Sequence, residues 1–79
     1  MEKIFGKKLR EKRKSKGLLI RDLAARADIS ESYISRIECG YTTPLLTTVM
    51  CLAAALECDA RELIPTKAEV LQENLQKTA

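Results

Sequence analysis

Hydrophobic residues recur at helical spacing along most of the chain, and the clearest repeats are two short stretches between residues 20 and 40. The apolar residues of the first stretch share one face of a helix, at Ile20, Leu23, Ala24 and Ala27. In the second stretch Ile34 and Ile37 face inward, and Gly40 supplies the left-handed residue that commonly ends a helix. The pattern predicts two short amphipathic helices in close succession.

The break between these two helices is too short for an ordinary loop. It contains Asp28, Ile29 and Ser30, and the Ser30 hydroxyl can cap the second helix. The small side chain of Ala24 allows that helix to cross close to the first. Because successive residues turn by about 100°, the outward face of the second helix carries short polar side chains and an arginine, at Ser32, Ser35, Arg36 and Cys39. A helix, a short turn and a helix with such an outer face form the helix-turn-helix plan.

Further helices are expected on both sides of this unit. Residues 4–16 form a helix that turns Phe5 and Leu9 inward. On the C-terminal side, Thr43 is expected to cap a helix that has Pro44 at its first position. The apolar stripe of that helix is predicted at Leu46, Val49, Leu52, Ala53 and Leu56.

Two shorter helices are predicted after it. Asp59 can cap a helix over residues 60–64, which a proline ends. Thr66 and Glu69 fit the capping box, in which a hydroxyl is followed three residues later by a glutamate, so a last helix is expected over residues 67–76. Its narrow apolar seam consists of Ala68, Leu71 and Leu75.

These elements predict an all-α fold with a compact five-helix domain over residues 1–65. Residues 66–79 add a C-terminal helix and tail, which either brace the domain or dimerise. The chain of 79 residues is 46% hydrophobic and contains no Trp, so the core should be aliphatic and the protein folded. No alternating pattern typical of strands is present.

The net charge of +3 is unevenly distributed. Residues 1–21 hold nine Lys and Arg against two Glu, whereas residues 22–79 hold five against nine acidic residues. A basic end on an acidic remainder favours the approach of one side to a polyanion. The alternative is a lysine-rich helix that is merely solvated, which the neighbouring helix-turn-helix makes less attractive.

Several function classes are disfavoured by composition. No apolar run approaches the length of about 20 residues that spans a membrane, and the N-terminal segment lacks an apolar signal core, so a cytoplasmic location is expected. The three cysteines, Cys39, Cys51 and Cys58, are widely spaced and there is no histidine, which argues against zinc and against most general-base catalysis. We expect no metal, no cofactor, no small-molecule ligand and no enzymatic activity.

The chain resembles the phage repressor and Cro-type helix-turn-helix regulators, known as the XRE family, from about Ile4 to Ile64. The residues that carry it, through their order and spacing, are Gly17-Leu18, Leu23-Ala24, Tyr33 to Glu38, Gly40, Pro44, Ala53, Leu56 and Glu62-Leu63. The resemblance implies a small bacterial or phage transcription regulator that binds a palindromic operator in double-stranded DNA as a homodimer. In size the chain is similar to restriction-modification controller proteins.

The resemblance also implies a site, with residues 31–39 as a recognition helix in the major groove. The expected base-reading residues are Glu31, Ser32, Ser35 and Arg36. The expected phosphate contacts are Ile20, Arg21, Ser30, Tyr33, Tyr41, Thr42 and Thr43. The alternative for Ser30 and Glu31 is that they only start the helix, and the alternative for Arg36 is a surface ion pair.

Three positions depart from the family pattern. Leu19 and Ile20 stand where relatives have Ser or Thr followed by Gln, so we expect the first N–H groups of that helix to lack a local partner. Asp28 stands where a glycine is usual and should tolerate the left-handed conformation. Tyr41 replaces a Lys or Arg.

The resemblance further implies an ion pair between Arg13 and Glu38 and a homodimer interface at Leu45, Met50, Ile64, Leu71 and Leu75. RNA polymerase is a further candidate partner. A toxin protein is the candidate partner under the alternative function, that of an antitoxin-type autoregulator. A DNA-independent interaction module on the same fold is a third reading.

Overall fold

Helices make up all the regular structure of the computed structural model, which describes residues 2–77 and the side chains of residues 3–72. The elements in chain order are α1 (Glu2–Ser15), α2 (Ile20–Ala27), α3 (Glu31–Glu38), α4 (Leu46–Ala55), a 3-10 turn η1 (Ala60–Glu62) and α5 (Lys67–Lys77). No strand occurs over this range, so the expected all-α fold is confirmed. None of the described helices is long and apolar enough to span a bilayer.

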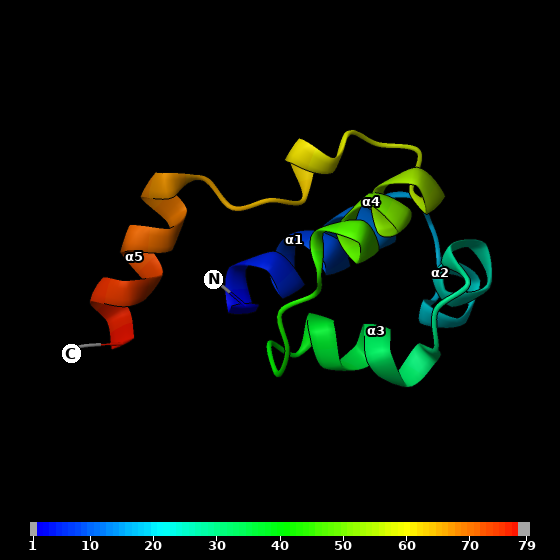
Figure 1. The fold of residues 1–79 in the computed structure, drawn as a ribbon, viewed down its shortest axis with the longest axis horizontal. Coiled ribbons are helices and arrows are strands. Elements are labelled where there is room, and N and C mark those ends of the chain that lie inside the picture. Colours follow the sequence, from blue (N-terminus) through cyan, green and yellow to red (C-terminus); the bar gives the residue numbers. More distant parts are fainter. Residues whose placement is uncertain (1, 78–79) are drawn as a thin grey trace.

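The first four helices pack around one core, while α5 stands apart from them (Figure 1). In Figure 1, α1 runs behind α4, α3 lies below both, and α2 closes the opposite end from α5. The largest fully buried side chains come from every one of these helices and from the residues that follow α4 and η1: Phe5, Leu9, Leu23, Ile34, Ile37, Leu52, Leu56 and Leu63. The core is therefore aliphatic with a single aromatic ring, as the composition predicts.

The helix ends of the central unit follow the local signals in the sequence. Gly17 and Gly40 have φ angles of +70° and +80°, a conformation that glycine adopts without strain. Asp28 takes the left-handed conformation as well, with φ 57° and ψ 46°, so this residue does serve in the place of a glycine. The turn between α2 and α3 thus keeps its geometry, although an L-residue is strained there.

The start of α4 differs from the prediction. Thr43 does not cap the helix and Pro44 is not its first residue; Leu45 is the N-cap, with an extended backbone at φ −68° and ψ 157°, and α4 begins at Leu46. Pro44 is buried. Leu46 is 64% exposed instead of lying in the core stripe. Leu46 lines an apolar pocket with Phe5 and Val49, but most of its surface faces solvent.

The predicted helix over residues 60–64 is only one 3-10 turn. Asp59 caps it as expected, since its side chain accepts a hydrogen bond from the Arg61 N–H at 2.9 Å. Leu63 already lies outside the turn as its C-cap. Ile64 precedes a proline, which disfavours the helical conformation, and this explains why the turn does not extend into a helix.

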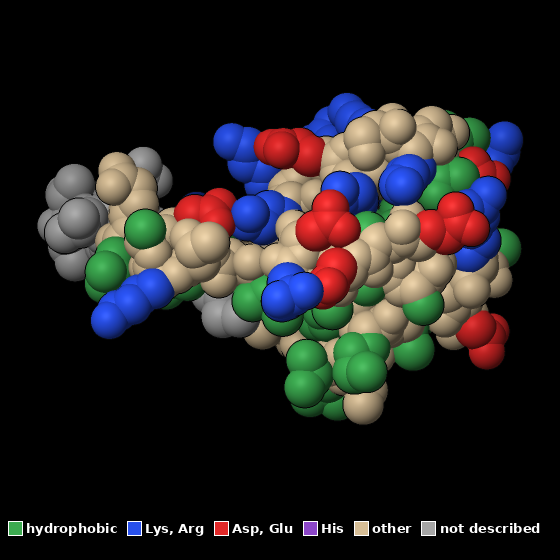
Figure 2. All heavy atoms as spheres, turned by 90° about the horizontal axis from the view of Figure 1, so that it is seen from above, with side chains coloured by type: hydrophobic (Ala, Val, Ile, Leu, Met, Phe, Trp, Pro, Cys, Tyr) green, Lys and Arg blue, Asp and Glu red, His purple; other side chains and the backbone are tan. Residues whose placement is uncertain are grey.

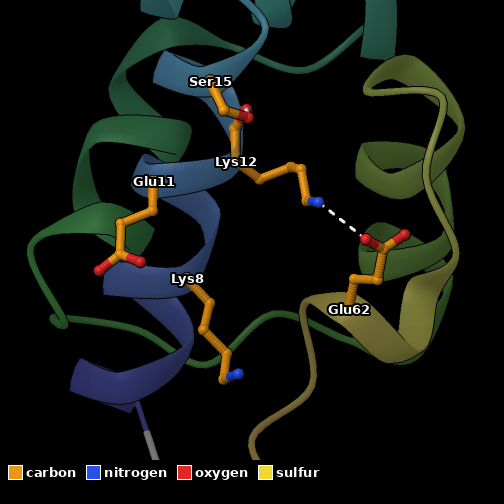
Figure 3. A pocket seen from close by; sticks show the side chains of 5 residues that line it. All are labelled: Lys8, Glu11, Lys12, Ser15 and Glu62. Atoms are coloured by element: carbon orange, nitrogen blue, oxygen red, sulfur yellow. Dashed lines mark hydrogen bonds and ion pairs between the residues drawn. The ribbon is translucent and has the colours of Figure 1, made fainter.

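The C-terminal segment is held to α1 by two ion pairs. Lys12 Nζ lies 2.8 Å from Glu62 Oε1, and Lys8 Nζ lies 3.1 Å from Glu69 Oε1. Figure 3 shows Lys8 and Lys12 on α1 beside a groove, with Glu62 on its far side. The capping box of α5 is confirmed, because the Glu69 N–H donates to Thr66 Oγ1 and the Thr66 N–H donates to Glu69 Oε1.

These contacts shift the pKa values of both carboxyl groups. The hydrogen bond from Lys12, followed by one from the Asp59 N–H, lowers the pKa of Glu62 below its ordinary value. The Thr66 N–H, followed by Lys8, lowers the pKa of Glu69 in the same way. A carboxyl group with a lowered folded-state pKa stabilises the fold above its ordinary pKa, and this stabilisation is lost as the pH falls through the lowered value.

Replacing Glu62 and Glu69 together by glutamine should therefore reduce stability at neutral pH and have no such effect in acid. At about pH 7 we expect the double variant to unfold at lower urea concentration than the wild type. The difference should narrow as the pH falls through the lowered pKa values and should disappear in strong acid, where both carboxyl groups are protonated in the folded state as well as in the unfolded state. Urea titrations of the two proteins at both pH values measure it, and a gap of equal size at both would contradict the ion-pair explanation.

Candidate nucleic-acid interface

The outward face of α3 brings the four predicted base-reading residues together. Their side chains are exposed and line one surface depression together with Ile20 from the start of α2: Glu31, Ser32, Ser35 and Arg36. The opposite face of α3 buries Ile34 and Ile37 completely. Since the helix turns by about 100° per residue, burial of that face leaves the polar face in solvent.

The start of α3 is fixed by Ser30. Its Oγ accepts a hydrogen bond from the Tyr33 N–H at 3.1 Å, and its backbone is extended at φ −68° and ψ 148°. Ser30 therefore acts as the helix cap, while its side chain remains exposed. Tyr33 is half-buried against the core, so only part of its side chain faces solvent.

At the N-terminus of α2, Asp22 provides a hydrogen-bond acceptor that the sequence analysis did not predict. Leu19 caps no N–H group with its side chain, but its own N–H donates to Asp22 Oδ2 at 2.8 Å. This is one half of a capping box, and the spacing of three residues was its signal in the sequence. The N–H groups of Ile20 and Arg21 have no hydrogen-bond acceptor in the described part of the chain. They remain available to an anion, and the exposed Arg21 side chain adds positive charge there.

One backbone N–H group of the turn after α3 is already hydrogen-bonded within the protein. The Tyr41 N–H donates to the Arg36 carbonyl oxygen at 3.0 Å, so it is not free to bind a phosphate. The Tyr41 side chain is 78% exposed. Thr43 is exposed and Thr42 half-buried. The N–H groups of Thr42 and Thr43 have no acceptor in the described part of the chain. These two N–H groups and the three hydroxyls are the donors that this turn presents.

A bidentate ion pair between Arg13 and Glu38 fixes α3 against α1. Arg13 Nε lies 2.8 Å from Glu38 Oε2 and Nη2 lies 2.9 Å from Oε1, with only 9% and 6% of the two side chains exposed. The remaining guanidinium nitrogen, Nη1, donates to the Leu18 carbonyl oxygen at 2.8 Å. The hydrogen bonds to Glu38 raise the pKa of Arg13 above its ordinary value. The ion pair that the resemblance implies is thus present, and it also holds the segment before α2.

Close backbone approach reinforces this junction. A Cβ atom at Gly6 would meet the carbonyl oxygens of Ile37 and Glu38. Glycine at this position allows α1 to lie directly against the C-terminal end of α3. The position of α3 is therefore set by backbone contact as well as by the ion pair.

A second surface carries exposed apolar side chains. Leu45, Leu46 and Met50 are 73%, 64% and 57% exposed. Ile64, which is 36% exposed, lines an apolar pocket together with Leu46 and Phe5. Figure 2 shows hydrophobic side chains projecting from the lower edge of the molecule, over the N-terminal end of α4. We call Leu45, Leu46, Met50 and Ile64 the apolar cluster.

Three of the five predicted dimer residues belong to the apolar cluster, and the other two do not. Leu71 is 52% exposed on α5, which stands apart from α4 (Figure 1). The side chain of Leu75 lies outside the described residues. Leu46, which the sequence placed in the core, joins the cluster instead.

The three cysteines differ in exposure. Cys39 and Cys51 are exposed and Cys58 is half-buried. Burial raises the pKa of the Cys58 thiol, which keeps it protonated and unreactive at neutral pH. Across the described side chains no three His, Cys, Asp or Glu residues converge as metal ligands.

Comparison with known proteins gives consistent relatives. A helix-turn-helix family model, HTH_3, matches residues 9–63. The chain is 39% identical over 57 residues to the HTH-type transcriptional regulator DdrOP3 of Deinococcus deserti, which covers 72% of this chain and 44% of that protein. The chain therefore spans less than half the length of that relative.

Three solved structures share the fold. The restriction-modification controller protein C.AhdI from Aeromonas hydrophila superposes with a TM-score of 0.77 at 37% identity, covering 78% of this chain and 94% of that one. The hypothetical transcription factor NHTF from Neisseria gives 0.78 at 25% identity, covering 90% and 82%. The clp gene regulator ClgR from C. glutamicum gives 0.75 at 26% identity, covering 78% and 80%.

The Arg13–Glu38 pair should dominate the stability of this surface. Glu38→Gln leaves a buried guanidinium without its counter-charge, and we expect a loss of about 3–5 kcal/mol in the free energy of unfolding. Asp59→Asn is the control, because it weakens the exposed pair with Arg61 while keeping a capping side chain, and it should change little. Urea unfolding of the two variants makes the comparison. Equal midpoints for Glu38→Gln and the wild type would rule out this role.

Proposed function

The chain belongs to the helix-turn-helix family HTH_3 and is a DNA-binding transcription regulator, and we propose that it binds a palindromic operator as a homodimer. The observation that carries the proposal is the exposed polar face of α3, on which Glu31, Ser32, Ser35 and Arg36 gather. A helix presented this way suits the major groove, where side chains reach the edges of the bases.

Each group on this surface has a different part in the proposal. Arg36 has the guanidinium geometry for a bidentate contact with guanine, and Ser32 and Ser35 are short enough to reach base edges or phosphates. Glu31 can accept from a cytosine amine. The free N–H groups at Ile20 and Arg21, with the hydroxyls of the turn after α3, are placed to hold phosphates on either side of the recognition helix.

Dimerisation is proposed to occur through the apolar cluster. A single helix-turn-helix reads only a few base pairs, whereas two copies joined by a two-fold axis read half-sites about 34–36 Å apart. The apolar cluster lies away from the outward face of α3, so its burial between two copies leaves both recognition helices free. The side chains of Leu45, Leu46 and Met50 are too exposed to be explained by the core of one copy.

A controller-type regulator is favoured over an antitoxin-type autoregulator. The match to the controller protein C.AhdI extends over 94% of that chain, so nearly the whole fold of that controller protein is present here. An antitoxin would need a separate surface for its toxin, for which α5 with Leu71 is the available candidate. Selection of bound sequences from a random DNA pool tests the main proposal, and enrichment of an inverted repeat is the expected result. A pool without any enriched sequence would contradict it.

The proposed base-reading role predicts different effects for two arginines. Arg36→Ala should lose about 1–3 kcal/mol of discrimination at one base pair of each half-site. Arg21→Ala should weaken binding to all sequences alike. It should also reduce the slope of log K against log salt concentration by about one for each half-site. Binding to a set of single-base operator variants distinguishes the two. If Arg36→Ala keeps the wild-type base preference at every operator position, Arg36 on α3 does not read a base as proposed.

The proposed interface predicts how single charges affect assembly. Met50→Glu introduces a charge into the apolar cluster and should yield a monomer, whereas Leu71→Glu changes an equally exposed apolar residue on α5 and should leave the dimer intact. Sedimentation at about 10 μM, where a dimer held by about 7 kcal/mol begins to form, separates the two outcomes. A wild-type monomer at that concentration would defeat the dimer proposal, and loss of the dimer in Leu71→Glu alone would move the interface to α5.

A further inference from the structure

The basic residues of α1 divide into two sides of the helix. Lys8 and Lys12 face the C-terminal segment and are paired with Glu69 and Glu62. The other side carries four cations at intervals of four, three and four residues, which places them on one stripe along the helix, at Lys3, Lys7, Arg10 and Lys14. We call these four residues the cationic stripe.

The cationic stripe is exposed, and its charges are not neutralised locally. All four side chains are exposed, and none forms an ion pair with a carboxylate among residues 3–72. Glu11, the one acidic residue on α1 whose side chain is described, lies four residues after Lys7 and three before Lys14. It forms an ion pair with neither of them, and it lines the groove of Figure 3 with Lys8 and Lys12. Like charges at this spacing repel one another, so the stripe is more favourable when a polyanion is near.

The stripe begins beside the DNA-reading unit. A Cβ atom at Gly40 would lie 2.9 Å from Lys3 Cγ, so Lys3 packs against the turn that follows α3. At the other end of α1, Lys14 lies one turn before Gly17, which leads to the N-terminus of α2. Over eleven residues the stripe is about 16 Å long. It therefore runs alongside the helix-turn-helix from the end of α3 to the start of α2.

The stripe also faces away from the apolar cluster. Phe5 lines the apolar pocket with Leu46 and Ile64. At about 100° per residue, the residues of the stripe lie on the opposite side of α1 from Phe5. If the apolar cluster joins two copies at a central axis, the stripe of each copy points outward along the duplex, beyond its half-site. An outward-facing row of cations meets phosphates of the flanking DNA before any other part of the complex.

We propose that the cationic stripe is a second DNA contact, which binds the phosphates of duplex that flanks the operator. The proposal rests on the proposed function, because the outward direction of the stripe follows from the dimer and from α3 in the major groove. Lysine side chains contact phosphates as point charges without reading sequence. The stripe thus adds affinity for flanking DNA of any sequence, and the duplex must follow the side of α1 to reach it.

The test compares two double variants on two duplexes. Lys7→Gln/Lys14→Gln removes two charges from the cationic stripe, and Lys8→Gln/Lys12→Gln removes two lysines of the same helix on the paired side. One duplex carries the selected operator trimmed to the protected region, and the other adds about one helical turn, roughly 10 base pairs, of arbitrary sequence on each side. Fluorescence anisotropy over a range of salt concentrations gives the affinity of each protein for each duplex, and circular dichroism checks that both variants are folded.

We expect wild type and Lys8→Gln/Lys12→Gln to prefer the long duplex, and Lys7→Gln/Lys14→Gln to bind both duplexes alike. The dimer loses four phosphate contacts, two from each copy, which lowers the salt slope on the long duplex by about four, so the affinity lost by that variant should shrink roughly a hundredfold between 50 and 200 mM salt. If the stripe variant keeps the wild-type preference for the long duplex, the proposal is wrong, and an acidic protein surface becomes the better partner. Failure of the wild type to bind even the trimmed duplex would instead overturn the proposed function.

Discussion

Arg13 on α1 contacts both the end of α3 and the segment before α2. A buried guanidinium destabilises the fold unless it has a counter-charge and an acceptor for each of its N–H groups. Glu38 at the end of α3 supplies the counter-charge, and the Leu18 carbonyl before α2 accepts from the remaining nitrogen. Moving α3 relative to α1 would separate the pair, and moving the start of α2 would leave a guanidinium N–H without an acceptor. The two helices of the reading unit are therefore positioned by the same side chain. Because the C-terminal end of α3 is fixed by this ion pair, the exposed face of α3 has a fixed orientation relative to α1.

The helix-turn-helix was predictable because its signals are local. The Ser30 cap, the left-handed Asp28 and Gly40, and the spacing of Ile34 and Ile37 each act within a few residues, and all of them appear in the structure. The outward side of α3 followed from the helical turn alone. The ion pair between residues 13 and 38 is not a local signal, and only the family resemblance suggested it.

The start of α4 and the end of the domain were not predictable in the same way. Thr43 followed by proline is a good local start signal, but the burial of Pro44 leaves the backbone extended as far as Leu45. As a result Leu46 moves from the predicted core to the surface. Whether the Tyr41 N–H is free also depends on how α3 ends, because this N–H donates to the Arg36 carbonyl oxygen. In each case the tertiary arrangement decided between two conformations that the local sequence allows.

The packing of α1 on the end of α3 has a consequence for the order in which the protein forms. A chain made from its N-terminus completes α1 first, yet the residues that cover Phe5 and engage Arg13 belong to α3 and to later segments. A free helix of the length of α1 is only marginally stable in water. Arg13, which is buried in the folded protein, also has no counter-charge until Glu38 has been synthesised. The nascent chain should therefore gain its structure late and in one step. The surface that reads DNA would arise together with the core, rather than ahead of it.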